Sequence, residues 1–228
     1  MLGKTHGAIG GMTGALLLPC LQLPRPQLNV PSWLNQIMGQ ATQTRVEDVC
    51  MIIIGIGLST IGSLMPDLDE PNSTISREVA PIPLLSRRIS MLAMAGCLWL
   101  SSIVGWLPFQ LSLILSLWLG IAAIVKHRGI THSLLGTGLV FIAIRAMDPS
   151  LAIAFTVGYA SHLLADMLTN HGVVLFWPFP VRVRIPTGLR TGSVLEPIIQ
   201  LGATGITALM ILSAAFGHNV LPIVQRWL

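Results

Sequence analysis

The chain has 228 residues, of which 53% are hydrophobic and only 10% are charged, with a formal net charge of +4. An ordinary soluble domain carries about 25% charged residues, so the composition argues against a water-soluble globule, and the high hydrophobicity excludes a disordered chain. The charge does not indicate nucleic-acid binding, because no basic run with interleaved aromatic residues occurs. We therefore expect a membrane protein whose partner is the lipid bilayer, with no nucleic-acid partner.

Seven apolar segments follow one another along the chain, and most are 16 to 20 residues long. We place them at 6–22, 49–65, 89–105, 109–125, 132–147, 150–168 and 197–216. A helix needs roughly 20 residues to cross the hydrocarbon, with about 17 as the lower bound, and its backbone groups must be paired internally. The period-2 alternation of a membrane barrel is missing. The sequence predicts an all-α, polytopic transmembrane helical bundle of about seven helices, forming a single integral membrane domain over residues 1–228.

The first segment follows Lys4 and could be a secretory signal, but Pro19 stands where a small residue is wanted before a cleavage site, which favours a retained helix. Small residues four apart let a neighbouring helix approach closely. They occur at Gly7/Gly11, Gly10/Gly14 and Gly55/Ser59. The three cysteines lie inside apolar segments without a paired spacing, so we expect neither a disulfide nor a cysteine metal site.

If every segment crosses the membrane once, nine of the 13 Lys and Arg residues fall on the same side as the N-terminus. Positive charge marks the cytoplasmic side, so the N-terminus is predicted to face the cytoplasm from a multi-pass inner-membrane protein. Histidines and aspartates gather on or near the same side: His6, His127, His132, His162, His171, Asp67, Asp69 and Asp166. Ionisable groups at membrane depth are costly and usually functional, and His with Asp is the ligand set of a divalent metal.

Two pairs of residues carry this expectation. His162 and Asp166 are four residues apart, which places them on one helical face, either as a zinc ligand pair or as a buried hydrogen-bonded pair without metal. Asp67 and Asp69 lie between prolines on what we expect to be an extended loop. On such a loop both carboxylates can face one ion, or one can ligate while the other accepts a proton. A polar turn that ends the second helix is the alternative.

A third motif, Lys-His-Arg-Gly-Ile-Thr-His-Ser at 126–133, joins the fourth and fifth segments, with His127 and His132 near its two ends. Arg128 either holds a phosphate oxygen through a bidentate contact or serves as a charge at the membrane surface. At the start of the first segment, His6 is either an interfacial histidine or a member of the site.

Other polar and aromatic residues have simpler interpretations. We interpret His171 as a loop residue, His218 as a surface residue at the opposite interface, and Glu196 as an acid that complements the dipole at a helix start. The aromatic stretch at 176–179 is typical of an anchor at the membrane interface.

These motifs together resemble the YdjM-type membrane-bound metal-dependent hydrolases, a family often described as under LexA (SOS) control. The resemblance rests on Lys4–His6, Pro66–Asp69, His127–Ser133 and Gly158–Asp166 and extends to Pro178. The family is described as distantly similar to zinc phospholipase C and single-strand nucleases, which use His and Asp ligands on helices. The resemblance implies these metal-site residues: His6, Asp67, Asp69, His127, His132, His162 and Asp166.

The first hypothesis is therefore a metal-dependent hydrolase of the inner membrane that cleaves a phosphoester in a lipid or another amphipathic molecule. One or two Zn²⁺ or Mn²⁺ ions would be its cofactor, and Asp67 or Asp69 would ligate or act as general base. Arg128 and Thr131 would hold the substrate oxygens. The second hypothesis is a divalent-cation or proton transporter that uses the same cluster. The third is a non-catalytic membrane scaffold whose His and Asp residues only bond one another.

Overall fold

The computed structural model describes residues 2–19, 32–70, 73, 75, 87–125, 128–187 and 189–216. Its helices are α1 (Gly3–Leu17), α2 (Ser32–Leu64), η2 (Met65–Asp69), α4 (Arg87–Ile103), α5 (Phe109–Ile124), η3 (Ile130–His132), α6 (Leu134–Arg145), α7 (Pro149–Met167) and α8 (Leu195–Ala215). The elements η2 and η3 are 3-10 helices. Among these residues β-structure is limited to two isolated β-bridges, so the predicted all-α fold is confirmed.

Six of the seven predicted segments agree with an α-helix to within five residues at either end. The exception is the second, expected at 49–65, because α2 begins much earlier, at Ser32. Its first half contains Gln, Ala, Arg and Glu residues, which favour helix but do not appear as an apolar run. At 33 residues and 1.5 Å per residue, α2 is about 50 Å long, more than one hydrocarbon thickness.

Two stretches of the described chain are long and apolar enough to cross a membrane, Val49–Asp69 and Leu195–Ala215. Three other apolar helices are shorter, at Arg88–Ile103, Phe109–Ile124 and Leu134–Arg145. Because a span needs roughly 20 residues, the expected seven crossings are not confirmed.

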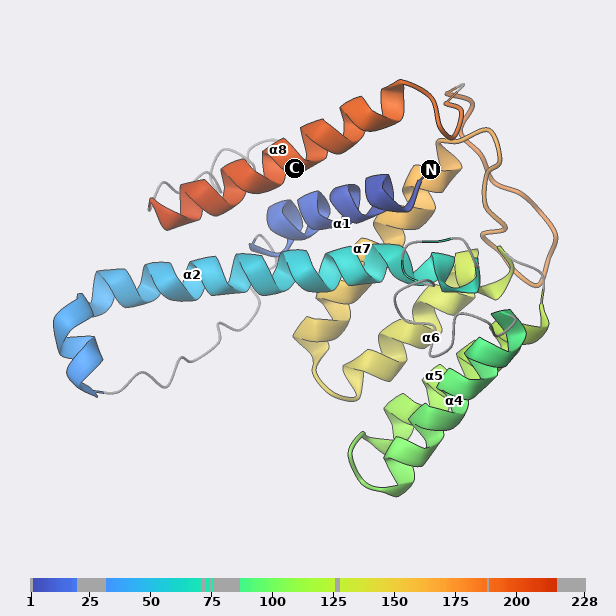
Figure 1. Cartoon of the computed structure of the whole chain (residues 1–228), viewed down its shortest axis with the longest axis horizontal. Helices are drawn as coiled ribbons and strands as arrows, with labels where there is room; N and C mark the ends of the chain where they lie inside the picture. The colour runs from blue at the N-terminus through green and yellow to red at the C-terminus, as the bar shows by residue number, and fades with distance from the viewer. Residues whose placement is uncertain are drawn as a thin grey trace.

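Several helices begin or end in the same region of the molecule (Figure 1). α1 lies between α2 and α8, and α7 crosses them while contacting α1, α2 and α6. α4 and α5 form a hairpin that joins the rest of the bundle through α6. The starts of α1 and α8 and the ends of α2 and α7 therefore lie at the same end of the molecule (Figure 1).

Glycines allow α1 and α7 to pack with their backbones in close contact with the backbone of α2. A Cβ placed on Gly10 or Gly14 of α1 would lie 2.8 Å from a backbone oxygen of α2, that of Ser59 or Gly55. Between α2 and α7 the approach is closer, since a Cβ on Gly158 would lie 1.8 Å from the Ser59 oxygen. The close approach predicted from the small-residue spacings of the first two segments is thus confirmed.

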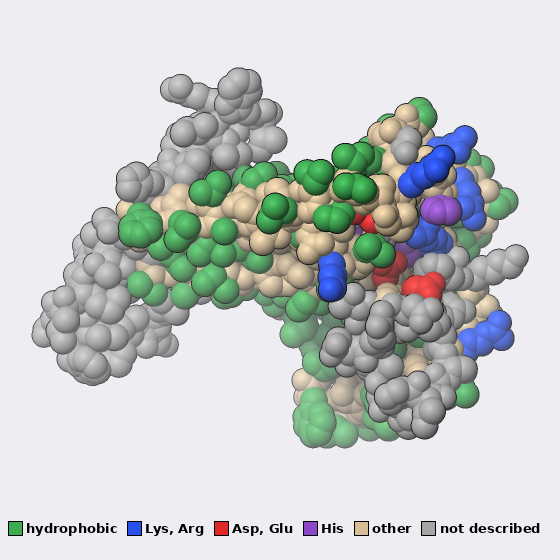
Figure 2. Space-filling model, turned by 45° about the horizontal axis from the view of Figure 1, so that its top comes forward, with side chains coloured by type: hydrophobic (Ala, Val, Ile, Leu, Met, Phe, Trp, Pro, Cys, Tyr) green, Lys and Arg blue, Asp and Glu red, His purple; other side chains and the backbone are tan. Residues whose placement is uncertain are grey.

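Apolar and charged side chains separate on the outer surface. Large hydrophobic side chains are exposed along α5 and α8, including Ile124, Leu201 and Leu209, as expected of a surface that faces lipid. Lys, Arg and His side chains instead gather at the end where the helix termini meet (Figure 2). A membrane location is supported by this distribution and by the two candidate spans.

Candidate metal centre

The site is assembled from four separate parts of the chain. α1 contributes His6, η2 contributes Asp67, η3 contributes His132, and α7 contributes His162 and Asp166. The side chains of His132, His162 and Asp166 are completely buried and that of His6 is 1% exposed, whereas 13% of the Asp67 side chain reaches the surface. The ends of α1, α2 and α7 thus place imidazoles and carboxylates that are far apart in sequence in one buried cluster.

The inner contacts of the cluster involve His132, His162 and Asp67. The two Nε2 atoms of the histidines are 3.2 Å apart. Asp67 Oδ1 lies 3.5 Å from His132 Nε2 and 3.7 Å from His162 Nε2. Three potential ligand atoms therefore face a common point.

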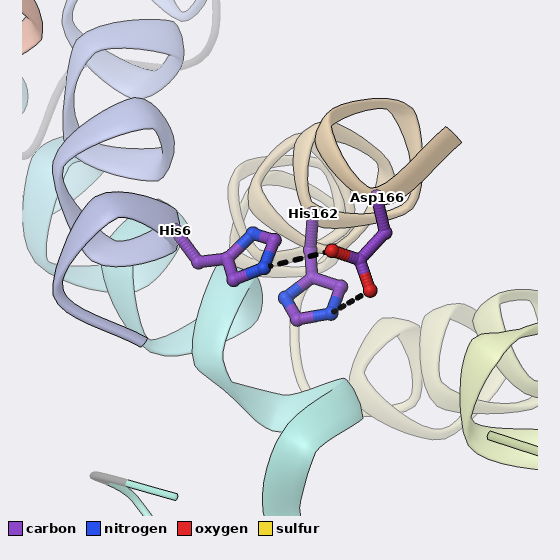
Figure 3. Close-up of side chains that lie close together, drawn as sticks. All are labelled: His6, His162 and Asp166. Atoms are coloured by element: carbon purple, nitrogen blue, oxygen red, sulfur yellow. Dashed lines mark ion pairs between the residues drawn. The ribbon is translucent and has the colours of Figure 1, made fainter. Parts of the chain in front are cut away.

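Asp166 lies beside these three residues and bridges to His6 and Arg128. Its Oδ1 is 3.2 Å from His6 Nε2, and its Oδ2 is 3.3 Å from Arg128 Nη2. The same Oδ2 is 3.8 Å from His132 Nε2 and 3.9 Å from His162 Nε2. Figure 3 shows His6 and His162 on the same side of Asp166, with their rings stacked at a centroid distance of 3.7 Å.

The hydrogen bond at the far side of His162 decides which of its ring nitrogens can ligate. Nδ1 lies 2.6 Å from the backbone oxygen of Ser63. A carbonyl only accepts, so Nδ1 carries the proton and Nε2 presents its lone pair to Asp67, His132 and Asp166. Such a bond from the second nitrogen to a carbonyl is typical of metal-ligating histidines.

His6 takes part in the cluster through Nε2, which lies 3.2 Å from Asp166 Oδ1. Its Nδ1 is buried and has no hydrogen-bond partner among the described residues. The donor set of imidazole nitrogens and carboxylate oxygens suits Zn²⁺ and also Mn²⁺.

Five of the seven metal-site residues implied by the resemblance lie in two overlapping groups whose ligand atoms are within 4.8 Å of one another: His6, His162 and Asp166, and Asp67, His132 and His162. His127 lies outside the described residues. Asp69 is buried beside the cluster, where its carboxylate contacts Thr131 and the backbone of Arg128. The metal roles of these residues remain predictions.

The segment that carries the two aspartates differs from the extended loop that we expected. Met65–Asp69 is a 3-10 helix with Pro66 in its first turn. A 3-10 helix has three residues per turn, so side chains two positions apart point in directions that differ by about 120°. Asp67 therefore faces the histidines while Asp69 faces Thr131.

Two other polar residues, Glu196 and His171, make their contacts outside the cluster. Glu196 is 3% exposed, and its carboxylate accepts the backbone N–H groups of Leu2 and Gly192 at 3.0 and 2.7 Å. It therefore ties the starts of α1 and α8 together. His171 is exposed on the loop after α7, as expected, and its backbone oxygen accepts from Arg182.

Sequence reasoning missed two supporting groups. One is the Ser63 backbone oxygen, for which no side-chain pattern gives a signal. The other is Tyr159, whose buried hydroxyl donates to the backbone oxygen of Thr131. As the single tyrosine of the chain, three residues before His162 on α7, it could have been selected for its placement on the same helical face.

The fold and the site define a class: a helical membrane protein with a buried His/Asp cluster that could hold a metal ion. The chain belongs to the YdjM inner membrane protein family, whose model matches residues 1–224. It is similar to an uncharacterized protein, YvsG, of Bacillus subtilis (strain 168), with 29% identity over 146 residues, 63% of this chain and 69% of that protein. It is also similar to the inner membrane protein YdjM of Escherichia coli (strain K12), with 40% identity over 73 residues, 29% of this chain and 37% of that protein. No solved structure matches.

Proposed function

We propose that this protein is a metal-dependent hydrolase of the inner membrane, with one divalent cation held by Asp67, His132 and His162. The observation that carries the proposal is the convergence of two histidine Nε2 atoms and one carboxylate oxygen at 3.2–3.7 Å from one another. In a tetrahedral zinc site with bonds of about 2.0–2.1 Å, neighbouring ligand atoms lie about 3.3 Å apart. The observed spacing is therefore close to that of a zinc site.

A single ion fits the donor atoms better than two. Both groups that could hold a metal include His162, and only its Nε2 is available, since Nδ1 bonds to Ser63. One lone pair ligates one ion, so the two groups compete for it. We infer one centre in which Asp166 and His6 border the three ligands.

A divalent ion bound there would supply a Lewis acid that polarises a phosphoryl oxygen and acidifies a bound water. Asp166 is paired with His6 at Oδ1 and with Arg128 at Oδ2, so its carboxylate is held in place as a charged group beside the three proposed ligands. The Arg128 side chain is 25% exposed and so provides the positive group that can meet an anionic substrate from outside. The position of the cluster at the helix ends favours a phosphoester at headgroup level, in a lipid or an amphipathic molecule.

The arrangement also supports hydrolysis over transport. A transport path needs ion-binding groups that continue across the membrane and are reached from both sides. In the described part of the chain, the groups that could hold a metal all lie at one end of the bundle. In a scaffold without metal, the lone pair of His162 Nε2 would face the carboxylate oxygens of Asp67 and Asp166, which also only accept, with no ion between them.

Elemental analysis of the detergent-purified full chain tests the metal centre. We expect about one Zn²⁺ or Mn²⁺ per chain, because the two groups of donor atoms share the one available nitrogen of His162. A chelator should remove the ion together with phosphoesterase activity in proteoliposomes, and the same metal should restore both. Protein that is folded, active and free of metal would contradict the proposal.

Arg128 is expected to govern the response to substrate charge. It has φ of 62°, where glycine is tolerated and most other residues are strained, so Arg128→Gly removes the guanidinium without backbone strain. The loss of one charged hydrogen bond, worth about 1.5–3 kcal/mol, should lower kcat/KM for an anionic phosphoester about 10- to 100-fold. Kinetics with a neutral ester provide the comparison, and an equal loss for both substrates would contradict this role.

A further inference from the structure

Asp69 and Thr131 form hydrogen bonds beside the proposed ligands without belonging to them. The Thr131 hydroxyl oxygen lies 3.1 Å from Asp69 Oδ2 and 3.0 Å from Nδ1 of His132. The side chains of Asp69, Thr131 and His132 are all 0% exposed. Thus an acid and a hydroxyl from different elements meet behind the ring of one candidate ligand.

The donor and acceptor roles in this chain of contacts follow from the number of hydrogens. A carboxylate only accepts, so the single hydroxyl hydrogen of Thr131 is donated to Asp69. The hydroxyl oxygen is then an acceptor toward His132, and Nδ1 of that ring must carry the proton. His132 Nε2 is left with its lone pair, 3.2 Å from Nε2 of His162.

We propose that Asp69 and Thr131 act as a relay that locks His132 in its Nδ1–H tautomer and thereby prepares Nε2 to bind the cation. This inference rests on the proposed metal centre and assigns Asp69 and Thr131 as positioning residues, in place of the ligand and substrate-binding roles expected from sequence. Asp67 and Asp69, two positions apart, therefore have different roles: Asp67 faces the proposed ion, and Asp69 sets the tautomer of the ligand His132.

The backbone around the relay holds it in position. The backbone N–H of Arg128 donates to the same Asp69 Oδ2 at 3.3 Å, and the Tyr159 hydroxyl donates to the backbone oxygen of Thr131. The η2 helix turns Asp69 away from the histidines and toward Thr131. The segment 128–133, which includes η3, is thus attached to η2 through Arg128 and Thr131 and to α7 through Thr131.

The relay is tested with three variants of the full chain in detergent. Thr131→Val keeps the shape of the side chain and removes the hydroxyl, whereas Thr131→Ser keeps the hydroxyl. Thr137→Val is the matched control, since that hydroxyl donates to the backbone oxygen of Ser133, the residue that caps its own helix. Outer partners of metal-ligating histidines typically change affinity 10- to 100-fold. We expect Zn²⁺ affinity to fall by about that factor in Thr131→Val, and to stay within a few-fold of wild type in the other two.

A second measurement needs no metal. The ¹⁵N chemical shifts of His132 in metal-free, ¹⁵N-histidine-labelled protein should show a protonated Nδ1 in wild type and in Thr131→Ser. Thr131→Val should give a mixture of tautomers. If Thr131→Val does not fold, Thr131→Ala decides, because it also removes the hydroxyl and should give the same mixture of His132 tautomers.

The outcomes separate this inference from the proposed function. Wild-type protein that binds no metal refutes the metal centre, whatever the tautomer. Wild-type protein that binds Zn²⁺, with unchanged affinity in Thr131→Val or with the His132 proton on Nε2, refutes the relay and leaves the metal centre in place.

Discussion

Replacement of His162 by alanine is expected to abolish metal binding. His162 Nε2 belongs to both groups of donor atoms, so no alternative set of three remains complete among the described residues. The loss of affinity should exceed the roughly 10- to 100-fold that an outer partner contributes. The measurement is metal content after purification, together with Zn²⁺ affinity by competition with a chelator.

The exposed His171, on the loop after α7, provides the control, and His171→Ala should keep its full metal content. His162→Gln retains more of the buried volume, and it should fold and still lack metal. If folded His162→Gln retained one ion per chain with wild-type affinity, the assignment of the centre would be wrong.

Replacement of Gly158 by alanine is expected to have the largest effect on stability. The added Cβ would lie 1.8 Å from the backbone oxygen of Ser59, and a helix backbone cannot move aside as a side chain can. Overpacking typically costs about 1–3 kcal/mol, and separation of α2 from α7 would also move Ser63 away from His162. We expect a lower unfolding temperature in detergent and reduced metal content.

The matched control for this variant is Gly202→Ala on α8. A Cβ at Gly202 meets nothing within 4 Å, and alanine favours a helix interior by roughly 0.5–1 kcal/mol over glycine. Its unfolding temperature should therefore equal or exceed that of wild type. Equal unfolding temperatures for the two alanine variants would show that the close contact of α2 and α7 does not matter for stability.

Hydropathy alone predicted six of the helices with accuracy, because an apolar run in a membrane protein has few alternatives to a helix. It failed for the first half of α2, where polar residues with good helix propensity extend the helix. Hydropathy also does not determine how many helices cross the bilayer, since helices of 12 to 17 residues are short of a full span.

The sorting of charged residues by topology also anticipated the cluster. His6, Asp67, His132, His162 and Asp166 come from four parts of the chain and lie together at one end of the bundle. The prediction worked because polar groups within an apolar chain have few places to be satisfied, so they gather where the helices end.

The sequence by itself determined a helical membrane protein, the glycines that bring its helices together, and the His and Asp residues that meet. Only the tertiary structure decided their individual roles. Whether a ring nitrogen carries a proton depends on the group behind it, a Ser63 oxygen for His162 and a Thr131 hydroxyl for His132. Whether Asp67 or Asp69 faces the cluster depends on the 3-10 geometry of η2. Ser63 is far from His162 in the sequence, and the hydroxyl of Thr131 is fixed by Asp69 of another element, so residue spacing along the chain does not determine these roles.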